Sequence, residues 1–561
     1  MVIVIITVIL LIVLLIKSVL DEKEYEKKLE KRLLSQWGQK PNCDYSYEKF
    51  NSLKKYYERQ KKSITNVDSI TWNDIDMDEV FLLINNTQCS IGEEYLYALL
   101  HQLKFEDSEL KERNRLMECF IAEEKNRLNL QKCFAKMGKL NQISFYEYVN
   151  IVDEIVPHKP WIHYFCCFGL LGTAGLLFIP GALKIGFLVM LGFVVFNILY
   201  YYKRKGQIER YLSVFSYILR MLSNVDDLDA VSFDGISDYT NRLNEIAKQF
   251  KKFRRHSYFL IAGRNMSGSL QDIILDYIRM LFHIDLIKFD TMLSEVQKKK
   301  NYLNEMFEII GFLDSMLAAA SFRASLNGNY CIPQLKNEKT NHLEVEEVYH
   351  PLIHNPVKNT IKENQCVLLT GSNASGKSTF IKTIAINAIL SQTIFTSLSK
   401  SYHANYFMVY SSMALQDSLQ TKESYYIVEI TSLKRILDLT NRDIPMLCFV
   451  DEVLRGTNTI ERIAASSQIL KTFTNRNTMC FAATHDIELT YILEKFYSNY
   501  HFQEEIKNNE VVFDYKLYRN RATSRNAIRL LGMLGYDDSI IADADAEVSY
   551  FIKNNNWNVL S

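Results

Sequence analysis

The sequence predicts an α/β domain with a mainly parallel sheet, preceded by an all-α region that contains transmembrane helices. From about residue 346, short β-rich runs alternate with helical segments, which is typical of a parallel sheet with crossover helices. Before that point, periodic apolar runs and a low count of eight prolines in 561 residues indicate long helices. Apolar stretches within the helical region indicate membrane spans.

Bulk composition indicates a packed chain without a dominant charge. Lys+Arg and Asp+Glu both number 65, so the zero net charge does not indicate a nucleic-acid or membrane-surface binder. Basic clusters at residues 54–62, 248–255 and 298–300 are interpreted as solvated helix faces, with contacts to phosphates or anionic lipid as the alternative. The ten cysteines show no C-x-x-C pair and no zinc-type spacing with histidine, which favours reduced thiols.

Residues 1–20 form a first apolar segment. Residues 1–16 are apolar except for Thr7, and about 20 helical residues can cross the hydrocarbon core of a bilayer. A cleaved signal peptide would place basic residues before the apolar core and a small-x-small site after it, and the sequence has neither. We therefore predict an uncleaved transmembrane anchor.

Residues 161–202 form a second apolar region, which Pro180-Gly181 divides into two stretches of about 20 residues each. Basic residues precede the pair at Lys159 and follow it at residues 203–205, so a tight hairpin places both flanks on one side. The positive-inside rule makes that side cytoplasmic. With the first anchor, this predicts three transmembrane helices in a multi-pass protein of the cell membrane, with its soluble parts in the cytoplasm. The alternative is a buried helical hairpin in a soluble core.

A phosphate-binding loop lies in the stretch CVLLTGSNASGKSTFIKT. Residues 371–378 fit the pattern G-x-x-x-x-G-K-[ST], with a predicted strand before them and a predicted helix after them. In this pattern backbone N–H groups surround the phosphates, Lys377 reaches the β- and γ-phosphate oxygens, and Ser378 offers its hydroxyl to Mg²⁺. We therefore predict an ATP and Mg²⁺ site. The predicted nucleotide-binding residues are Gly371, Ser372, Asn373, Ala374, Ser375, Gly376, Lys377, Ser378 and Thr379.

Two further predicted strands end in polar residues. MLCFVDE ends in Asp451-Glu452, and MCFAATH ends in His485. Phosphates bind at the carboxyl edge of a parallel sheet, so these side chains should reach the phosphate loop. Asp451 would hold the hydrated Mg²⁺, Glu452 would polarise or position the attacking water, and His485 would sense or orient the γ-phosphate. The alternatives are a capping Asp-Glu pair and a structural histidine.

Segments around these strands resemble the MutS family of DNA mismatch-repair ATPases, which belongs to the ABC ATPase superfamily. The matching segments occur in order as HPLI, TGSNASGKST, ES…VE with Ser424 and Glu429, DEVLRGTNT and ATHDIELT. The C-terminal FDYKLYR…AIRLLGMLGYDDSIIADA resembles that family's closing helix-turn-helix. The resemblance is strong over about 346–545 and weaker over 77–120 and 203–345.

The resemblance implies a P-loop ATPase domain of the ABC type, and together with the predicted membrane segments it divides the chain into five parts. These are a transmembrane anchor (1–20), a cytosolic helical region that forms part of the core (21–160), a transmembrane hairpin (161–202), a helical core and lever region (203–345), and the ATPase domain with its C-terminal helix-turn-helix (346–561). The ATPase domain is expected in the cytoplasm.

The resemblance also implies a homodimer with two composite ATP sites. Asn373 would help to place the γ-phosphate, and Ser424 would reach across the dimer interface to the partner's ATP. Arg455–Thr459 would connect the catalytic carboxylate to that interface. The expected catalytic residues are therefore Glu452, His485, Asn373 and Ser424.

The chain also departs from the family. Its repair members carry a mismatch-reading domain with a Phe-x-Glu wedge, and we identify no such domain in the about 140 residues between the first anchor and the hairpin, where the one Phe-x-Glu spacing is Phe145-Tyr146-Glu147. Ser372 replaces the family's usual proline, which the loop pattern tolerates.

The leading interpretation is a membrane-anchored ATPase that switches a helical clamp by dimer closure, with DNA as its substrate. One alternative is an ATP-gated, membrane-tethered scaffold for protein partners. The other is a transporter motor, which three spans and the lack of an L-S-G-G-Q-like segment disfavour.

Overall fold

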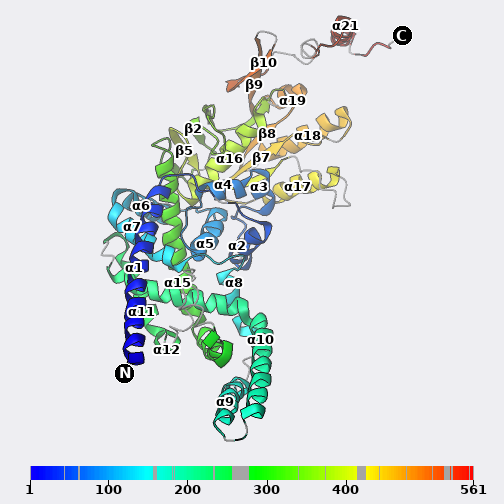
Figure 1. Cartoon of the computed structure of the whole chain (residues 1–561). Coiled ribbons are helices and arrows are strands. Elements are labelled where there is room, and N and C mark those ends of the chain that lie inside the picture. Colours follow the sequence, from blue (N-terminus) through cyan, green and yellow to red (C-terminus); the bar gives the residue numbers. More distant parts are fainter. Residues whose placement is uncertain are drawn as a thin grey trace. The chain divides into compact units, whose positions relative to one another are not determined.

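The computed structural model (Figure 1) describes residues 2–559 except 43, 61–62, 156–160, 180, 182, 231–233, 255–276, 279, 339, 373–374, 414–424, 441, 456, 475–476, 508–509, 523–527, 529–530, 532–534 and 555. The chain forms two compact units. The helical unit comprises Met1–Ser63, Phe81–His101 and Lys111–Asn327, and the α/β unit comprises Ile64–Val80, Gln102–Leu110 and Gly328–Ser561. The α/β unit thus includes two short segments of the N-terminal region.

The helical unit is all-α in its described part, as the sequence predicts. Its two longest helices, α10 and α15, have 44 and 42 residues and contain no proline. Its helices are α1 (Val2–Gln36), α2 (Tyr47–Arg59), α5 (Ser90–His101), α7 (Glu124–Met137), α8 (Phe145–Asn150), α9 (Trp161–Gly175), α10 (Leu183–Asp226), α11 (Ser237–Gln249), α12 (Lys251–Arg254), α15 (Ile284–Ser325), parts of α4 (Met77–Ile84) and α6 (Asp107–Ala122), and the 3₁₀ turns η1 (Val152–Glu154), η2 (Leu176–Phe178), η3 (Asp227–Ala230) and η4 (Asp234–Ile236).

Helix α5 lies at the centre of this unit, and all of its residues except Tyr95 are buried. It packs closely against α15, because a Cβ at Gly92 would lie 2.1 Å from a carboxylate oxygen of Asp314. Asp314 in turn accepts the backbone N–H groups of Gln88 and Cys89, just before α5 begins. A side chain from α15 therefore satisfies donors that the start of a helix leaves unpaired.

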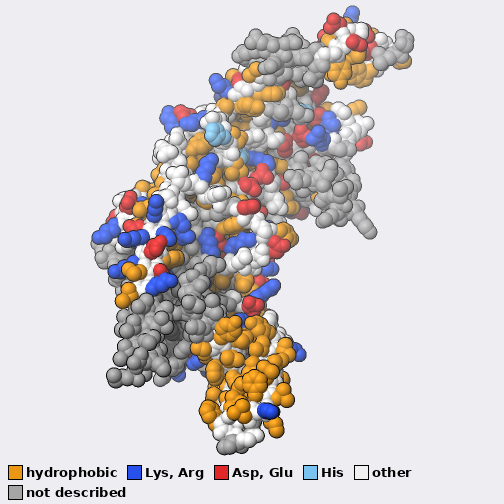
Figure 2. All heavy atoms as spheres, viewed as in Figure 1, with side chains coloured by type: hydrophobic (Ala, Val, Ile, Leu, Met, Phe, Trp, Pro, Cys, Tyr) orange, Lys and Arg blue, Asp and Glu red, His pale blue; other side chains and the backbone are white. Residues whose placement is uncertain are grey.

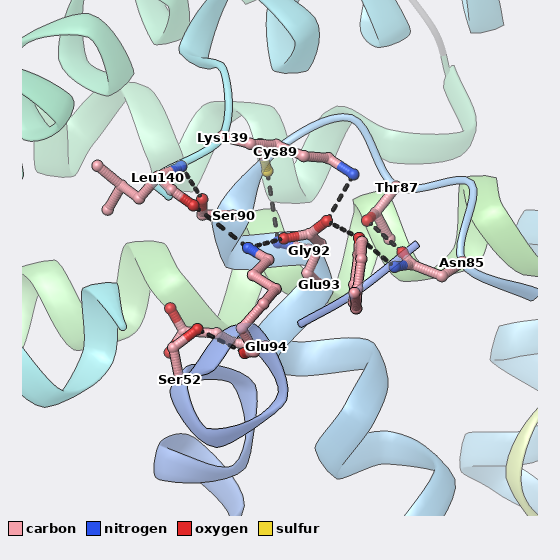
Figure 3. A network of polar contacts seen from close by, with 12 residues as sticks. Ser52, Asn85, Thr87, Cys89, Ser90, Gly92, Glu93, Glu94, Lys139 and Leu140 are labelled. Atoms are coloured by element: carbon pink, nitrogen blue, oxygen red, sulfur yellow. Dashed lines mark hydrogen bonds and ion pairs between the residues drawn. The ribbon is translucent and has the colours of Figure 1, made fainter. Parts of the chain in front are cut away.

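Figure 3 shows the buried polar side chains at the start of α5. The Glu93 carboxylate lies 2.7 Å from Lys49 Nζ and 2.6 Å from Lys139 Nζ, and Tyr45 donates its hydroxyl to the same group. Burial alone would raise the pKa of Glu93, but the two ammonium groups outweigh it and hold the pKa below its ordinary value. This paired charge fixes α2 and the segment after α7 against α5.

The neighbouring Glu94 joins α5 to α8 and is also buried. Its carboxylate accepts Ser144 Oγ at 2.7 Å and the backbone N–H of Phe145 at 2.6 Å, at the N-terminus of α8. No ammonium group pairs with it among the ion pairs of the described residues. Burial raises the pKa of Glu94 to about 8, although the hydrogen bonds from Ser144 and Phe145 act in the opposite direction.

The apolar region 161–202 forms a helical hairpin of α9, η2 and the first half of α10 (Figure 1). By length and composition, two helices here could cross a membrane, and only 17% and 11% of their most apolar windows are buried. Figure 2 shows apolar side chains gathered over this hairpin. The first apolar segment lies in α1, which starts at Val2; the side chains of residues 1–15 and 18–19 lie outside the described residues.

Polar contacts join the base of this hairpin to the start of α15. Asn197 Nδ2 donates to the carbonyl of Leu281 at 2.9 Å, and Tyr201 OH donates to Asp285 Oδ2 at 2.8 Å. The Nδ1 atoms of His163 and His283 lie 3.2 Å apart. Asn197, which the sequence places inside a predicted span, therefore has a hydrogen-bond partner within the protein.

The α/β unit contains a mixed sheet of four strands and a mostly parallel sheet of six. The four-stranded order is β1-β5-β2-β3, and the six-stranded order is β10-β9-β4-β8-β7-β6, in which only the β10–β9 pair is antiparallel. The strands are β1 (Gln334–Lys336), β2 (Leu343–Val348), β3 (Asn359–Glu363), β4 (Cys366–Thr370), β5 (Ser401–Asn405), β6 (Met408–Ser412), β7 (Met446–Asp451), β8 (Thr478–Ala483), β9 (Tyr497–Lys507) and β10 (Glu510–Arg519).

The expected mainly parallel sheet is therefore confirmed, and its central strands are fully buried. The helices of this unit are α3 (Ser69–Asp74), α16 (Lys377–Thr393), α17 (Tyr425–Leu439), α18 (Thr459–Thr474), α19 (Ile487–Ile492) and α21 (Asp538–Asn554). Every residue of β4 and β8 is buried, and so is every residue of β7 except the half-buried Asp451, as expected for strands covered on both faces. Of the expected C-terminal helix-turn-helix, the structure describes α21, while most of residues 523–534 lie outside the described residues.

The short helix α3 covers β6, the edge strand of the six-stranded sheet. Thr71 Oγ1 accepts the backbone N–H of Ser411 at 3.0 Å. Asp74 Oδ2 accepts the hydroxyl of Ser411 at 2.6 Å and the backbone N–H of Met413 at 3.0 Å. These contacts satisfy donors at the edge of the sheet and explain why Ile64–Val80 belongs to the α/β unit.

Replacing Glu94 with Gln should flatten the pH dependence of stability between about pH 5 and 8. Because the folded-state pKa is raised to about 8, the folded chain retains a proton that the unfolded chain releases near pH 4. This group therefore stabilises the fold at low pH, and the stability is lost as pH rises through that window, by at most about 1.4 kcal/mol per pH unit. Denaturant unfolding of wild type and Glu94→Gln at each pH measures the difference, and equal slopes would contradict it.

Candidate active site

The carboxyl ends of β4, β7 and β8 meet at one edge of the six-stranded sheet. β8 lies between the other two, and its Ala483 is level with Leu369 of β4 and Asp451 of β7. The phosphate loop begins two residues beyond Leu369, and His485 lies two residues beyond Ala483. Parallel pairing thus brings the three predicted motifs together at the edge where phosphates bind.

Two glycines give the phosphate loop its shape. Gly371 has φ +149°, and a Cβ there would lie 2.8 Å from Ser375 Oγ and 2.9 Å from the carbonyl of Phe502. Gly376 has φ +108°, in the left-handed region that glycine adopts most easily, and directly precedes α16. Helix α16 therefore starts at the loop, with its unpaired N-terminal N–H groups available to a phosphate. Asn373 and Ala374 lie outside the described residues.

Lys377 lies over the loop and is largely buried. Its Nζ donates to the carbonyls of Gly371 at 2.8 Å and Ser372 at 2.9 Å. Burial lowers the pKa of Lys377, although the carboxylates of Asp451, Glu452 and Glu504 oppose this effect. The ammonium group is thus held beside the loop, surrounded by carboxylates.

Ser378 and Asp451 lie in direct contact. Ser378 Oγ donates to Asp451 Oδ2 at 2.6 Å, across the gap between α16 and the end of β7. Asp451 Oδ1 and Ser375 Oγ are buried and have no hydrogen-bond partner among the described residues. A hydroxyl and a carboxylate with a spare oxygen are the ligands that Mg²⁺ prefers, so these residues fit the predicted metal. Burial raises the pKa of Asp451, and the Ser378 hydrogen bond acts against this.

Glu452 follows directly and faces His485. Glu452 Oε1 lies 2.7 Å from His485 Nε2, and Glu452 Oε2 lies 2.8 Å from a guanidinium nitrogen of Arg455. His485 Nε2 is also 3.4 Å from Lys377 Nζ, so the imidazole lies between the carboxylate and the loop. The side chain of Glu452 is 15% exposed.

The residue after His485 anchors this segment. Asp486 accepts two hydrogen bonds from Arg462 of α18, at 2.9 and 2.6 Å. The backbone N–H of Thr484 donates to the carbonyl of Leu369, which links the end of β8 to β4. His485 is therefore held by strand pairing on one side and by a two-pronged ion pair on the other.

Of the predicted catalytic and metal-binding residues, the structure brings Ser378, Asp451, Glu452 and His485 together, and the predicted phosphate-binding Lys377 lies with them. Thr379 lies exposed in the first turn of α16. Ser424, whose expected role is across a dimer interface, and Gly456 in the adjoining segment lie outside the described residues.

Two residues near the loop were missed by sequence reasoning, and Glu429, near the catalytic carboxylates, was named in a matching segment without a role. Glu504 of β9 accepts the hydroxyl of Ser372, which places a third carboxylate beside the phosphate loop. Tyr515 of β10 is 46% exposed and lies against Gly376, where an added Cβ would be 3.2 Å from its ring. Such a ring offers a stacking face for a nucleotide base. Glu429 of α17 accepts the backbone N–H of Leu454, just beyond the catalytic carboxylates.

Comparison with known proteins agrees with this geometry. Residues 367–551 match the family model of MutS domain V. That match covers the phosphate loop, Asp451-Glu452 and His485, and it implies that this part of the chain is an ATP hydrolase.

Curated relatives extend the similarity to about half of the chain. The DNA mismatch repair protein MutS of Methanosarcina barkeri is 28% identical over 272 residues, which are 46% of this chain and 30% of that protein. MutS of Thermotoga maritima is 28% identical over 281 residues, 48% of this chain and 34% of that protein. MutS protein homolog 4 of Mus musculus is 27% identical over 288 residues. The chain spans about a third of the length of these relatives.

Proposed function

We propose that this protein is a MutS-like ATPase that hydrolyses ATP in a composite homodimer and uses the cycle to switch its helical region on DNA. The observation that carries the ATPase part is the Ser378–Asp451 contact beside the Glu452–His485 pair, at the mouth of the phosphate loop. A metal-binding pair, a water-activating carboxylate and a phosphate-facing histidine are the parts that phosphoryl transfer to water needs.

Each group has a distinct part in the proposed reaction. Lys377 would exchange the carbonyls of Gly371 and Ser372 for the β- and γ-phosphate oxygens. Ser378 and Asp451 would hold Mg²⁺, which neutralises charge on the phosphates. Glu452 would orient the attacking water, and His485 would hold that carboxylate towards the γ-phosphate.

The DNA part of the proposal rests on the relatives and on exposed basic residues. The relatives from Methanosarcina barkeri and Thermotoga maritima are named DNA mismatch repair proteins. Within the basic clusters, Lys299 pairs with Glu295 and Lys300 pairs with Asp153, so much of the third cluster is neutralised. Exposed Lys251 and Lys252 in α12 lack an ion-pair partner among the described residues and are the better phosphate contacts.

We also propose that the α9–α10 hairpin inserts into a membrane, with the α/β unit in the cytoplasm. A core hairpin of a soluble protein would be mostly buried, whereas Phe168, Leu188 and Leu199 are 69%, 70% and 67% exposed. Trp161 and Tyr202 lie at the two ends of the apolar region, where interfacial aromatics occur. The apolar segment at residues 1–16 would provide a third span.

The ATPase proposal predicts different failures for two substitutions. Glu452→Ala should lower the rate of ATP hydrolysis by about 100-fold or more with ATP binding retained, because it removes only the water-orienting group. Lys377→Ala should weaken ATP binding as well. Steady-state hydrolysis and equilibrium binding of radiolabelled ATP measure both effects. Glu461→Gln, an exposed position in α18, is the matched control. Wild-type rates in either active-site variant would contradict the assignment.

The DNA proposal predicts salt-dependent binding of the solubilised protein to duplex, branched or mismatched DNA. The logarithm of the binding constant should fall linearly with the logarithm of salt concentration, because basic side chains release counterions from phosphates. Replacing Lys251 and Lys252 with Ala should reduce the slope by about two. Ala at the exposed Lys434 and Lys495 of the α/β unit controls for charge. Absence of binding at low salt, with and without a non-hydrolysable ATP analogue, would contradict the proposal that the protein binds DNA.

The membrane proposal predicts that exposed hairpin positions contact lipid. A photo-cross-linking residue, p-benzoylphenylalanine, at Phe168 or Leu188 should cross-link to radiolabelled phosphatidylcholine when the full chain is in vesicles. The same residue at Ile460, which is 79% exposed in the α/β unit, should not. Cross-links from Phe168 and Leu188 only to protein would mean that the hairpin is covered by a partner and not by lipid.

A further inference from the structure

The turn after β7 has an unusual backbone. Glu452 has φ +50° and Leu454 has φ +60°, so two non-glycine residues within three positions lie in the left-handed region. Such conformations are unfavourable for residues with a Cβ, and they persist only where surrounding contacts hold them. Since Glu452 is one of these residues, whatever holds the turn also sets the direction of the catalytic carboxylate.

The side chains that touch Glu452 directly are poor candidates for this task. The side chains of Arg455 and His485 are 61% and 38% exposed, so both can move in solvent. At the start of the turn the Glu452 N–H donates to the carbonyl of Ala483, and the buried Ser466 hydroxyl donates to the carbonyl of Val453 at 3.2 Å. The carbonyl of Leu454 accepts from Thr457, but these contacts leave the N–H of Leu454 to another partner. The turn therefore needs a buried side chain that holds the backbone at Leu454, its second left-handed residue.

Glu429 of α17 provides this support. Its side chain reaches the turn and accepts the backbone N–H of Leu454, whose own side chain is buried in the core beside the sheet. Glu429 is itself 9% exposed, and its second carboxylate oxygen has no partner among the described residues. Burial raises the pKa of Glu429, while the backbone N–H groups of Leu454 and Arg455 act against this.

Burying a carboxylate is costly unless hydrogen bonds compensate it, and Glu429 has no ion-pair partner among the described residues. Its negative charge is instead matched to successive backbone N–H groups, in the manner of an anion bound by a turn. The contact acts on the backbone at Leu454, two residues from Glu452, and Glu429 has no hydrogen bond to the described residues of the phosphate loop.

We propose that Glu429 is a positioning residue for ATP hydrolysis, which holds the left-handed turn at Leu454 and thereby keeps Glu452 aimed at the attacking water. This inference rests on the proposed ATPase function. Helix α17 starts at Tyr425, directly after the residue expected to reach the partner's ATP. One helix therefore links that segment to the backbone of the catalytic carboxylate, and a shift of α17 on dimer closure would act on Glu452 through Glu429.

The test compares hydrolysis with nucleotide binding in the full-length protein. Glu429→Ala should lower kcat by about 10- to 100-fold, as is usual for a group that orients a catalytic residue, with the Kd for ATP unchanged within about threefold. Glu429→Gln should retain more activity than Glu429→Ala, because its amide oxygen can still accept the Leu454 N–H. Glu461→Gln in α18 should match wild type in both measurements.

A double-mutant cycle separates positioning from general destabilisation. In a Glu452→Gln background, Glu429→Ala should have little further effect on kcat, because the group that it orients has already lost its function. Wild-type kcat in Glu429→Ala, full additivity with Glu452→Gln, or a loss of kcat matched by weaker ATP binding would each overturn the inference. Failure of the proposed function is distinguishable, because wild type itself would then hydrolyse no ATP.

Discussion

The parallel pairing of β4, β8 and β7 is the constraint on which the rest of the site depends. Each strand delivers its functional residue only because its carboxyl end lies level with its neighbours, where Leu369, Ala483 and Asp451 are in register. A one-residue slip of any of these strands would turn its buried side chains towards the other face of the sheet, so the core fixes the register. Packing of these buried strands therefore fixes the relative positions of Lys377 and Glu452.

The same unit contains a direct route from the N-terminal part of the chain to the nucleotide site. Within Ile64–Val80, Asp76 pairs with Lys382 of α16 at 2.6 Å, and Asp68 pairs with Arg435 of α17. These two helices begin at the phosphate loop and directly after Ser424, so one segment is tied to both helices. That segment continues through α4 into the helical unit, which gives the ATPase cycle a covalent path to the helices.

The sequence predicted the parts of the site that are local in the chain. The phosphate loop is one continuous motif, and Asp451, Glu452 and His485 each follow a short apolar run that indicates a buried strand. The contacts it missed are non-local. Glu504 lies 132 residues from Ser372, and their contact depends on the pairing of β9 with β4 and on which face of β9 each residue occupies. Likewise, the short helix α3 joins the α/β unit through individual polar contacts that leave no periodic signal.

The central claim is that this site hydrolyses ATP as a composite of two chains. The most direct test is to mix two variants that are each inactive alone. Chains with Lys377→Ala keep Ser424 but lose their own phosphate site. Chains with Ser424→Ala keep their phosphate site but cannot complete the site of the partner chain. Each variant alone should be inactive, and an equimolar mixture should recover about a quarter of wild-type hydrolysis, from one intact site in half of the dimers. A mixture no more active than the two separate variants would contradict the account.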